Sequence, residues 1–407
     1  MNMKETLFEK LEDKAPKMVQ HRRYLHEHPE LSFQENETAQ YIKDFYKDKD
    51  VTVTQPVKGS NAIIVEIKGQ RQGNTIGLRA DFDALPIQEE TNLPFKSLNE
   101  GVMHACGHDA HTAYLLELAD AFIEMKDELA GTVKIIHQHA EEMPPGGAQE
   151  LMESGTLSDI DEIYGIHVVP VAGPEVIGYN KGNAFAGSST FTLTIKGLGG
   201  HAASPHKTHD ALIAGTNFVN TLQTIVSRRI DPSEMGVVTV GSFEAPGGAN
   251  VIQDKVIIKG TARYLNDELE QFMYEEIEKI AKSVAVGFDI TYDLDYQFGY
   301  PVLYNHPKQT DNVASILRES KGDYFKHLIE IPAVTGSEDF AYYLKEIPGT
   351  FFVVGCKPEH IDAPYMNHHP KFEVNEDALL VAAKALGDIA INRLSTTEQK
   401  QHSYINQ

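Results

Sequence analysis

Three histidines, a cysteine and an aspartate lie within one short stretch, Met-His-Ala-Cys-Gly-His-Asp-Ala-His at positions 103–111. Cys106 and His108 are separated by one residue, a spacing that lets the end of a loop or strand direct both side chains at one point. A thiolate and an imidazole together suit zinc or a similar first-row divalent ion. A lone cysteine is more often a small buried apolar residue, but the flanking histidines and aspartate favour a metal site here.

Two further carboxylates follow an apolar run earlier in the chain. The runs 61–68 and 75–81 are bounded by turn-forming residues, and we predict that they form two strands paired with each other. The second run leads into Asp81 and Asp83, at the edge of an open α/β sheet where sites are usually built. These carboxylates could be metal ligands or could orient a histidine ligand, and the alternative is an ordinary acidic loop.

A second carboxylate pair, Glu141 and Glu142, follows the predicted strand 132–140 and precedes Pro144 and Pro145. A hydrolytic metal site needs one carboxylate oxygen as a ligand and one free carboxylate to take a proton from water. An isolated Glu-Glu pair is usually a solvated surface feature, but its position at the end of an apolar strand favours the site. The residues alone leave open which glutamate is the ligand.

The spacing of apolar residues predicts the elements that position these side chains. Helices are expected at 4–24, from Asn36 as N-cap through 38–47, at 112–129, near 311–321 and at 375–392, with further strands at 162–168, which ends with His167, and at 350–354. This alternation indicates an α/β domain with an open mixed sheet. His26 and His28 are expected at the surface. Cys356 is expected to be a partly buried thiol, and the polar residues after Arg393 are expected to fray.

The middle of the chain has a different order of elements. The predicted order is strand, helix, strand, strand, helix, strand, at 188–196, 210–228, 236–243, 255–263, 267–286 and 289–296. This βαββαβ order is that of a ferredoxin-like α+β domain, complete in itself. We therefore predict a catalytic domain formed by 1–182 and 298–407, and an inserted lid and dimerisation domain at 183–297. The free edge strands of such a sheet offer a route to a homodimer.

Composition limits the class of protein. The chain has 407 residues, of which 41% are hydrophobic, enough for two cores. The net charge of −23 repels phosphate backbones and anionic membrane surfaces, which argues against nucleic acid and membrane as partners. Only two cysteines occur, the N-terminal residues lack the apolar core of a signal peptide, and no run of about 18 apolar residues is present. We expect a cytoplasmic protein.

Seven motifs in order along the chain resemble the M20 metallopeptidases, and within them the amidohydrolase branch of hippurate hydrolases and plant auxin-conjugate hydrolases. The resemblance covers nearly the whole chain. The motifs are His-Glu-His-Pro-Glu-Leu-Ser at 26–32, Leu-Arg-Ala-Asp-Phe-Asp-Ala-Leu-Pro at 78–86, the cluster at 103–111, Ala-Glu-Glu at 140–142, Gly-Gly-His-Ala-Ala at 199–203, Gly-Ser-Glu-Asp-Phe-Ala at 336–341 and His-His-Pro at 368–370.

The resemblance implies a zinc-peptidase-like catalytic domain that holds two divalent metal ions, Mn²⁺ or Zn²⁺, in each subunit. The implied ligands are a bridging Cys106, His108, Glu142, His167 and His368. It also assigns the general base to Glu141, and it selects His368 rather than His369, a choice that the residues alone leave open.

The resemblance also implies the residues that handle substrate. The matching positions are His201, which in relatives reaches the oxyanion of the partner subunit, the substrate-binding residues Asn250, Arg263 and Gly336, and Asp81 and Asp83 behind the metal ligands. A guanidinium such as that of Arg263 suits the α-carboxylate of an amino acid. Where relatives often have Gln-Pro-Ala-Glu-Glu-Gly, this chain has Gln-His-Ala-Glu-Glu-Met-Pro-Pro at 138–145, so the base is kept while the neighbouring loop and the acyl pocket differ.

The leading hypothesis is hydrolysis of an N-acyl amino acid to a carboxylic acid and a free amino acid. A dipeptidase or aminopeptidase on the same metals is the nearer alternative, and it would tolerate a free α-amine on the substrate. A non-catalytic binding protein with a structural metal is the remote alternative. It is disfavoured because structural sites are closed, whereas the uncommitted Glu141 leaves room for water.

Overall fold

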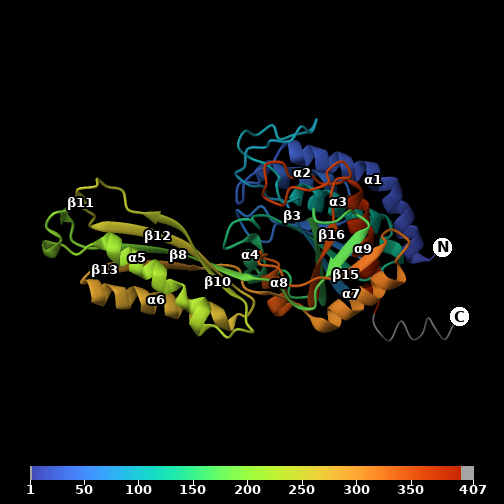
Figure 1. Cartoon of the computed structure of the whole chain (residues 1–407). Helices are drawn as coiled ribbons and strands as arrows, with labels where there is room; N and C mark the ends of the chain where they lie inside the picture. The colour runs from blue at the N-terminus through green and yellow to red at the C-terminus, as the bar shows by residue number, and fades with distance from the viewer. Residues whose placement is uncertain (1, 396–407) are drawn as a thin grey trace. The chain divides into compact units, whose positions relative to one another are not determined.

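The computed structural model describes residues 2–395, which form two compact units (Figure 1). The first unit contains the residues up to Gly182, Tyr304–Pro332 and the residues from Asp339, and the second contains Asn183–Leu303 and Ala333–Glu338. The predicted insert, 183–297, lies within the second unit. Among the described residues, no helix combines the length and the apolar character needed to cross a membrane.

The first unit is built on an eight-stranded sheet in the order β1-β2-β4-β3-β5-β16-β6-β15. Its strands are β1 (Thr52–Thr54), β2 (Ile63–Lys68), β3 (Arg71–Asp81), β4 (Ala130–Gln138), β5 (Glu162–Val169), β6 (Val176–Tyr179), β15 (His327–Glu330) and β16 (Gly349–Gly355). Strand β3 is parallel to β4 and β5, β5 is parallel to β16, and β2 is antiparallel to β4. The predicted α/β fold with a mixed sheet is confirmed.

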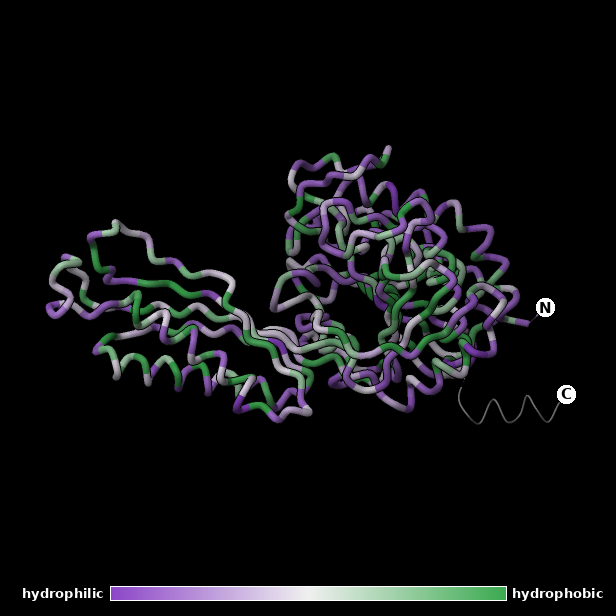
Figure 2. Tube along the Cα trace, in the orientation of Figure 1, coloured by the Kyte–Doolittle hydropathy of each residue, from purple (hydrophilic) through white to green (hydrophobic). Residues whose placement is uncertain are grey.

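Helices surround this sheet. They are α1 (Met3–Glu27), α2 (Asn36–Tyr46), α3 (His108–Glu124), η1 (Lys126–Glu128), α4 (Gly147–Glu153), α7 (Pro307–Glu319), α8 (Ala341–Glu346) and α9 (Asp377–Leu394). The core is formed by α1, α3 and α9 with the central strands, whose traces are largely hydrophobic in Figure 2. Helix α3 is buried over nearly its whole length, so the residues at its first turn are held rigidly.

The predicted pairing of the runs 61–68 and 75–81 is wrong. Strand β4 lies between β2 and β3, with Ile63 opposite His137 on one side and Asp81 opposite Gln138 on the other. Every residue of β4 except Thr132 is buried, as expected for a strand in the interior of a sheet covered on both faces. Neighbours in sequence usually pair, and here the burial of β4 overrides that tendency.

The starts of two helices near the site differ from the prediction, and α7 likewise begins at Pro307, four residues before the predicted 311. Helix α3 starts at His108 rather than Thr112, so the sequence cluster forms its first turn instead of preceding it. Asn36 is the first residue of α2 rather than its N-cap. The carboxylate of Glu30 caps that helix, since it accepts hydrogen bonds from the backbone N–H groups of Glu37 and Thr38.

Two residues are more buried than predicted. His26 is buried, and its imidazole bonds to the carboxylates of Asp109 and Glu89, so it is part of a polar network and not of the surface. Cys356 follows β16 and is completely buried. The predicted fraying beyond Arg393 concerns residues that, apart from Leu394 and Ser395, lie outside the described part of the chain.

The second unit has its own sheet and core. Its elements are β7 (Gly182–Phe185), β8 (Gly187–Lys196), β9 (Gly200–His201), η2 (Pro205–Lys207), α5 (Ala211–Leu222), η3 (Ile225–Arg229), β10 (Gly236–Glu244), β11 (Val251–Ile252), β12 (Lys255–Tyr264), α6 (Glu268–Phe288) and β13 (Thr291–Phe298). Strand β14 (Leu303–Asn305) begins at the last residue of this stretch and continues into the first unit. The main sheet is antiparallel, in the order β10-β12-β8-β13. Helices α5 and α6 pack against it through residues such as Phe218 and Ile277.

Candidate metal centre

The carboxyl ends of three parallel strands bring the predicted residues of the first unit together. Strand β3 ends at Asp81, β4 leads into Glu141 and Glu142, and β5 carries His167. Because β3 lies between β4 and β5 and is parallel to both, these ends meet at one edge of the sheet. The first turn of α3, which begins at His108, meets the same edge, since His108 bonds to the loop that follows β3.

Two groups of metal-donor atoms at this edge share Cys106. Cys106, His108 and His167 form one group, and Cys106, Glu142 and His368 form the other, with the donor atoms of each group within 4.8 Å of one another. Glu141 belongs to a further group with His108 and Glu142. The sharing of one sulfur by two donor groups is the arrangement required for a thiolate that bridges two ions.

Gly107 makes this approach possible. Its φ of +96° lies in the left-handed region that favours glycine, and a Cβ at this position would lie 2.5 Å from Cγ2 of Val168. Any other residue would push the loop that carries Cys106 away from β5. The glycine between Cys106 and His108 is thus required by the close packing of the two donor-bearing segments.

His108 presents one ring nitrogen to the cluster. Its Nδ1 donates to the backbone oxygen of Asp83 at 3.0 Å and to Oδ1 of Asp83 at 3.1 Å. Its Nε2 makes no hydrogen bond with any described residue and lies 3.9 Å from Oε1 of Glu142. Burial opposes protonation of this ring, but Asp81 and Asp83 outweigh burial and raise the pKa of His108 to about 10. A metal cation bound at Nε2 would balance the negative charge of the same two carboxylates, Asp81 and Asp83.

His167 is oriented in the same way, and His368 lies beside Glu142. Nδ1 of His167 donates to the backbone oxygen of Val168 at 2.8 Å, which leaves Nε2 facing the sulfur of Cys106 at 3.4 Å. Burial, followed by the neighbouring His111, lowers the pKa of His167 well below its usual range, so its ring is neutral. Nε2 of His368 lies 3.2 Å from Oε1 of Glu142. His369 instead stacks on Tyr365, with ring centroids 4.3 Å apart.

The electrostatics around Cys106 favour a cation. Burial, and then the charges of Glu142 and Glu141, raise the pKa of the Cys106 thiol well above its usual range. A thiolate in this position therefore needs positive charge beside it. The donor set of one sulfur, three imidazoles and a carboxylate, with the orphaned Nε2 of His108, fits two divalent ions of the zinc or manganese type.

Asp81 lies behind the cluster. Its Oδ1 accepts from Nδ1 of His111 at 2.6 Å, and its Oδ2 accepts from the guanidinium of Arg79 at 2.6 Å. Both oxygens are thus engaged with other side chains. Burial alone would raise the pKa of Asp81, but Arg79 and then His108 hold it well below its usual range.

Arg79 and His111 at this edge were not among the predicted site residues. Arg79 is completely buried and also donates to Gln138 and to Asp339, at 2.8 and 2.7 Å. His111 uses both ring nitrogens, since its Nε2 accepts from the backbone of Val168 at 3.0 Å. A charged residue inside the apolar strand β3, and a histidine one helical turn after His108, were the signals that could have identified them.

Asn367, next to His368, connects three donor-bearing segments. Its side-chain amide donates to the backbone oxygen of Cys106 at 3.0 Å and lies 3.8 Å from the sulfur of that residue. It also reaches the backbone oxygen of Val168 at 3.5 Å, the same oxygen that orients His167. Nothing in the sequence distinguished this asparagine from an ordinary loop residue.

The four predicted residues of the second unit lie at its two ends. His201 is on β9, paired with Val251 of β11, and the backbone oxygen of Asn250 accepts from the residue after His201. Arg263 is opposite Ser188 near the other end of β12. The backbone oxygen of Gly336 accepts from the N–H of residue 186, beside that same end. His201 and Asn250 are therefore together, and Arg263 and Gly336 belong to the opposite end.

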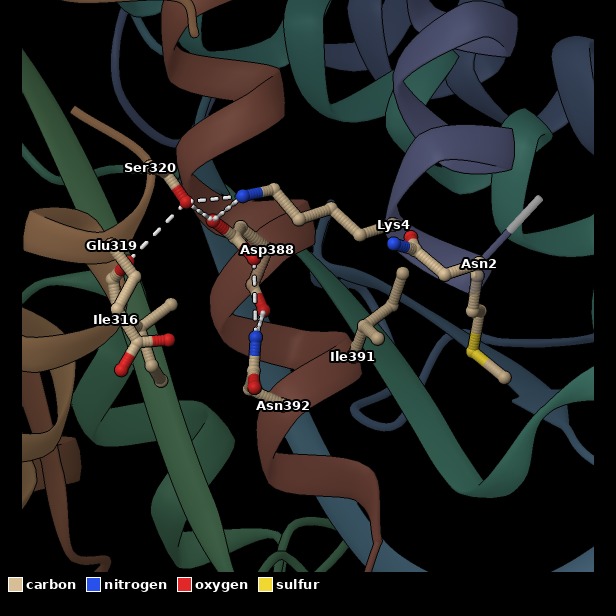
Figure 3. A pocket seen from close by; sticks show the side chains of 9 residues that line it. Asn2, Lys4, Ile316, Glu319, Ser320, Asp388, Ile391 and Asn392 are labelled. Atoms are coloured by element: carbon tan, nitrogen blue, oxygen red, sulfur yellow. Dashed lines mark hydrogen bonds and ion pairs between the residues drawn. The ribbon is translucent and has the colours of Figure 1, made fainter. Parts of the chain in front are cut away.

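A cavity of about 290 Å³ lies elsewhere in the first unit, between the start of α1 and the helices α7 and α9 (Figure 3). Lys4 bonds there to Ser320 at 2.5 Å and lies 3.6 Å from Asp388. Ser320 in turn donates to Asp388 at 2.5 Å. These polar groups satisfy one another, and none of the predicted metal ligands lines this cavity.

Comparison with known proteins places the chain in a family. The family model described as peptidase family M20/M25/M40 matches residues 77–392. The protein YhaA of Bacillus subtilis (strain 168) is 42% identical over 374 residues, which are 92% of this chain and 94% of YhaA. An N-acetyldiaminopimelate deacetylase of Brevibacillus brevis is 39% identical and covers 90% of this chain and 95% of its own length. An N-acetylcysteine deacetylase of Bacillus subtilis is 36% identical, with coverages of 94% and 99%.

Solved structures agree. A structure from methicillin-resistant Staphylococcus aureus has a TM-score of 0.90 and 46% identity, and the match covers 97% of this chain and 100% of that one. YXEP of Bacillus subtilis, described as a dinuclear metal binding peptidase of the M20 family, has a TM-score of 0.79 and 32% identity, with coverages of 94% and 99%. The chain is therefore a member of peptidase family M20/M25/M40.

Proposed function

We propose that this chain hydrolyses the amide bond of N-acyl amino acids, releasing a carboxylic acid and a free amino acid. The observation that carries the proposal is the pair of donor groups that share Cys106, with Glu141 beside them. Two relatives are named as deacetylases of N-acetylated amino acids, which supports the same substrate class.

We assign two divalent ions, Mn²⁺ or Zn²⁺, to this centre. Cys106 would bridge them, with His108 and His167 completing one donor group and Glu142 and His368 the other. The dinuclear description of YXEP supports two ions rather than one. Asp81 and Asp83 would support the ligands rather than bind the ions. Asp83 orients His108 through a hydrogen bond, and both oxygens of Asp81 already accept hydrogen bonds from Arg79 and His111.

When bound, the two ions would activate a water molecule and polarise the carbonyl oxygen of the scissile amide. Glu141 takes the proton that the attacking water releases, and it later delivers that proton to the leaving nitrogen. The water oxygen bonds to the carbonyl carbon and the carbon–nitrogen bond breaks, which yields the carboxylic acid and the amine. Burial of Glu141 keeps bulk water from competing for this proton.

We assign a lid and dimerisation role to the second unit. Its strand order supports the ferredoxin-like prediction. Strand β8 runs from the end of the unit that holds Arg263 to the end that holds His201. Ser188, which pairs with Arg263, and Lys196, the last residue of β8, are about 26 Å apart along the strand at about 3.3 Å per residue. One small substrate cannot contact both ends, so the roles assigned to His201 and Arg263 together support a homodimer in which His201 and Asn250 act on the substrate of the partner subunit.

A hydrolysis panel tests the function. Metal-reconstituted protein is incubated with acetyl-leucine, benzoyl-leucine and aminoacyl-leucine dipeptides, and leucine release is measured. We expect turnover of the N-acyl compounds, whereas turnover of the dipeptides alone would establish a dipeptidase. Glu141→Gln should lower kcat by about 10²–10⁴-fold while two equivalents of metal remain bound. Metal binding without turnover of any amide would favour a binding protein.

We also propose a cytoplasmic location. Both cysteines of the chain are free, which is the usual state in a reducing compartment. The net charge of −23 supports a small-molecule substrate rather than nucleic acid or a membrane surface.

A further inference from the structure

The segment after α1, residues 28–35, has no role in the hydrolysis described above, yet two of its side chains are buried against the metal-bearing loops. Ser32 donates to Oδ2 of Asp83 at 2.7 Å, the oxygen that also accepts the backbone N–H of Glu142 at 2.9 Å. Glu35 is completely buried, although it precedes the first turn of α2. A buried carboxylate needs hydrogen bonds to stay in place.

The partner of Glu35 is the backbone of Ala140. Oε1 of Glu35 accepts the N–H of Ala140 at 2.8 Å, and Oε2 accepts from the side-chain amide of Asn61 at 3.3 Å. Ala140 immediately precedes Glu141 and is itself completely buried. The contact therefore reaches the chain one residue before the proposed general base.

Ala140 has an uncommon backbone conformation. Its φ is +51°, in the left-handed region that costs free energy for a residue with a Cβ. Such a conformation persists only where surrounding contacts enforce it. The hydrogen bond from its N–H to Glu35 is one such contact, and the bond from the N–H of Gly147 to its carbonyl oxygen, at 3.1 Å, is another.

The environment of Glu35 adds to this argument. Burial, and then the charge of Asp83, raise the pKa of Glu35 to about 7. An apolar residue would cost less in this position, so packing alone does not explain the carboxyl group. Its function must lie in the hydrogen bonds that it accepts.

We propose that Glu35 is a positioning residue for Glu141. By holding Ala140 in the left-handed conformation, its carboxyl group fixes the direction in which the chain leaves β4 and thus where Glu141 points. This role rests on the proposed function only for its effect on rate, because the contact with Ala140 exists independently of any reaction.

Four variants test the proposal. Glu35→Ala removes the acceptor, whereas Glu35→Gln keeps an amide oxygen that can accept the same N–H. Ala140→Gly lowers the free-energy cost of the left-handed conformation. The double variant Glu35→Ala/Ala140→Gly combines the loss of the acceptor with that lower cost. The matched control is Glu30→Ala, because Glu30 belongs to the same segment but caps α2 instead. The measurements are kcat and KM for the preferred N-acyl substrate, bound metal per subunit, and hydrogen exchange of the peptide that contains Ala140.

Glu35→Ala should lower kcat by about 10–100-fold, with KM and two bound metal ions unchanged. Glu35→Gln should stay within about threefold of wild type, and the double variant should regain at least a third of the lost rate, because glycine adopts positive φ readily. Exchange at residue 140 should rise in Glu35→Ala and remain low in Glu35→Gln. Glu30→Ala should match wild type.

Several results would overturn the proposal. They are unchanged kcat in Glu35→Ala, equal losses in both Glu35 variants, loss of metal in step with kcat, or no recovery in the double variant. If Glu35→Ala does not fold, hydrogen exchange at residue 140 is measured instead in Glu35→Gln and in Ala140→Gly made in the wild-type background, and these two variants then test the proposal. If wild-type protein hydrolyses no amide, the proposed function fails, while the exchange data still show whether Glu35 holds Ala140.

Discussion

Asp83 accepts a hydrogen bond from Nδ1 of His108 at 3.1 Å, and this bond decides which nitrogen of His108 faces the metal centre. The other oxygen of Asp83 accepts the backbone N–H of Glu142 at 2.9 Å. One carboxylate therefore orients two proposed ligands that come from different elements, the first turn of α3 and the loop after β4.

Replacing Asp83 with asparagine should weaken metal binding. The variant keeps the shape of the side chain but loses its charge, and one of its two positions becomes a donor that cannot accept from His108 or Glu142. We expect the affinity for Zn²⁺ or Mn²⁺ to fall by about 10–100-fold, measured by calorimetry on metal-free protein. The exposed Asp13→Asn is the control. Unchanged affinity in Asp83→Asn would contradict the orienting role.

Metal should protect Cys106 from alkylation. A thiolate that bridges two cations is shielded by them, whereas chelation leaves Cys106 with 8% of its surface exposed to reagent. We expect iodoacetamide to label Cys106 only after chelation, and faster as the pH rises, because burial and the charges of Glu142 and Glu141 keep the pKa of the metal-free thiol high and the thiol protonated near neutral pH. The labelled protein should not rebind metal. Cys356 is completely buried and serves as the internal control in the same mass spectrum. Equal labelling of Cys106 with and without metal would argue against the bridge.

The cross-subunit role of His201 can be tested by mixing two inactive variants. Glu141→Ala and His201→Ala are refolded together so that subunits exchange. In a mixed dimer, one site lacks both groups and the other has its own Glu141 and the His201 of its partner. With random pairing, about a quarter of wild-type activity should return. If activity stays at the level of the separate variants after exchange is verified by mass, His201 acts within its own chain.

His137 should make the first unit sensitive to acid. Burial lowers the pKa of His137 to about 3, against 6.5 for an ordinary histidine, and its Nε2 bonds to Tyr46 at 2.9 Å. Between these two pH values the unfolded chain binds a proton that the folded chain does not. The free energy of unfolding therefore decreases as pH falls from about 6.5 towards about 3, with a slope of up to about 1.4 kcal/mol per pH unit from this group.

His137→Gln should remove that contribution, because glutamine can still bond to Tyr46 but does not titrate. Urea unfolding of metal-free protein at several pH values measures the difference in slope between the variant and wild type. His327→Gln, at an exposed position, should leave the slope unchanged. Identical slopes for wild type and His137→Gln would contradict the prediction.

The edge of the sheet at which the site lies could be predicted from the sequence, because Asp81 and Glu141 each follow an apolar run whose strand direction is set by the α/β pattern. The order of the strands could not, since the pairing of β4 with both neighbours depends on burial from two faces, which a linear pattern does not contain. The roles of Arg79 and Asn367 could not be predicted either. Each depends on contacts between segments far apart in the chain, such as Arg79 with Asp339 at 2.7 Å.

The first unit is discontinuous, and this has a consequence for synthesis on the ribosome. Helices α1 and α9 pack together, with Glu12 bonded to Lys384 at 2.5 Å, and Arg393 donates to both oxygens of Glu162 at 2.8 Å. The emerging chain cannot complete this unit until residue 393 has been translated, whereas nearly all of the second unit is finished by residue 303. The apolar faces of α1 and α3 that later pack against α9 therefore stay uncovered while more than two hundred further residues are translated. During that time they can contact only chaperones or each other.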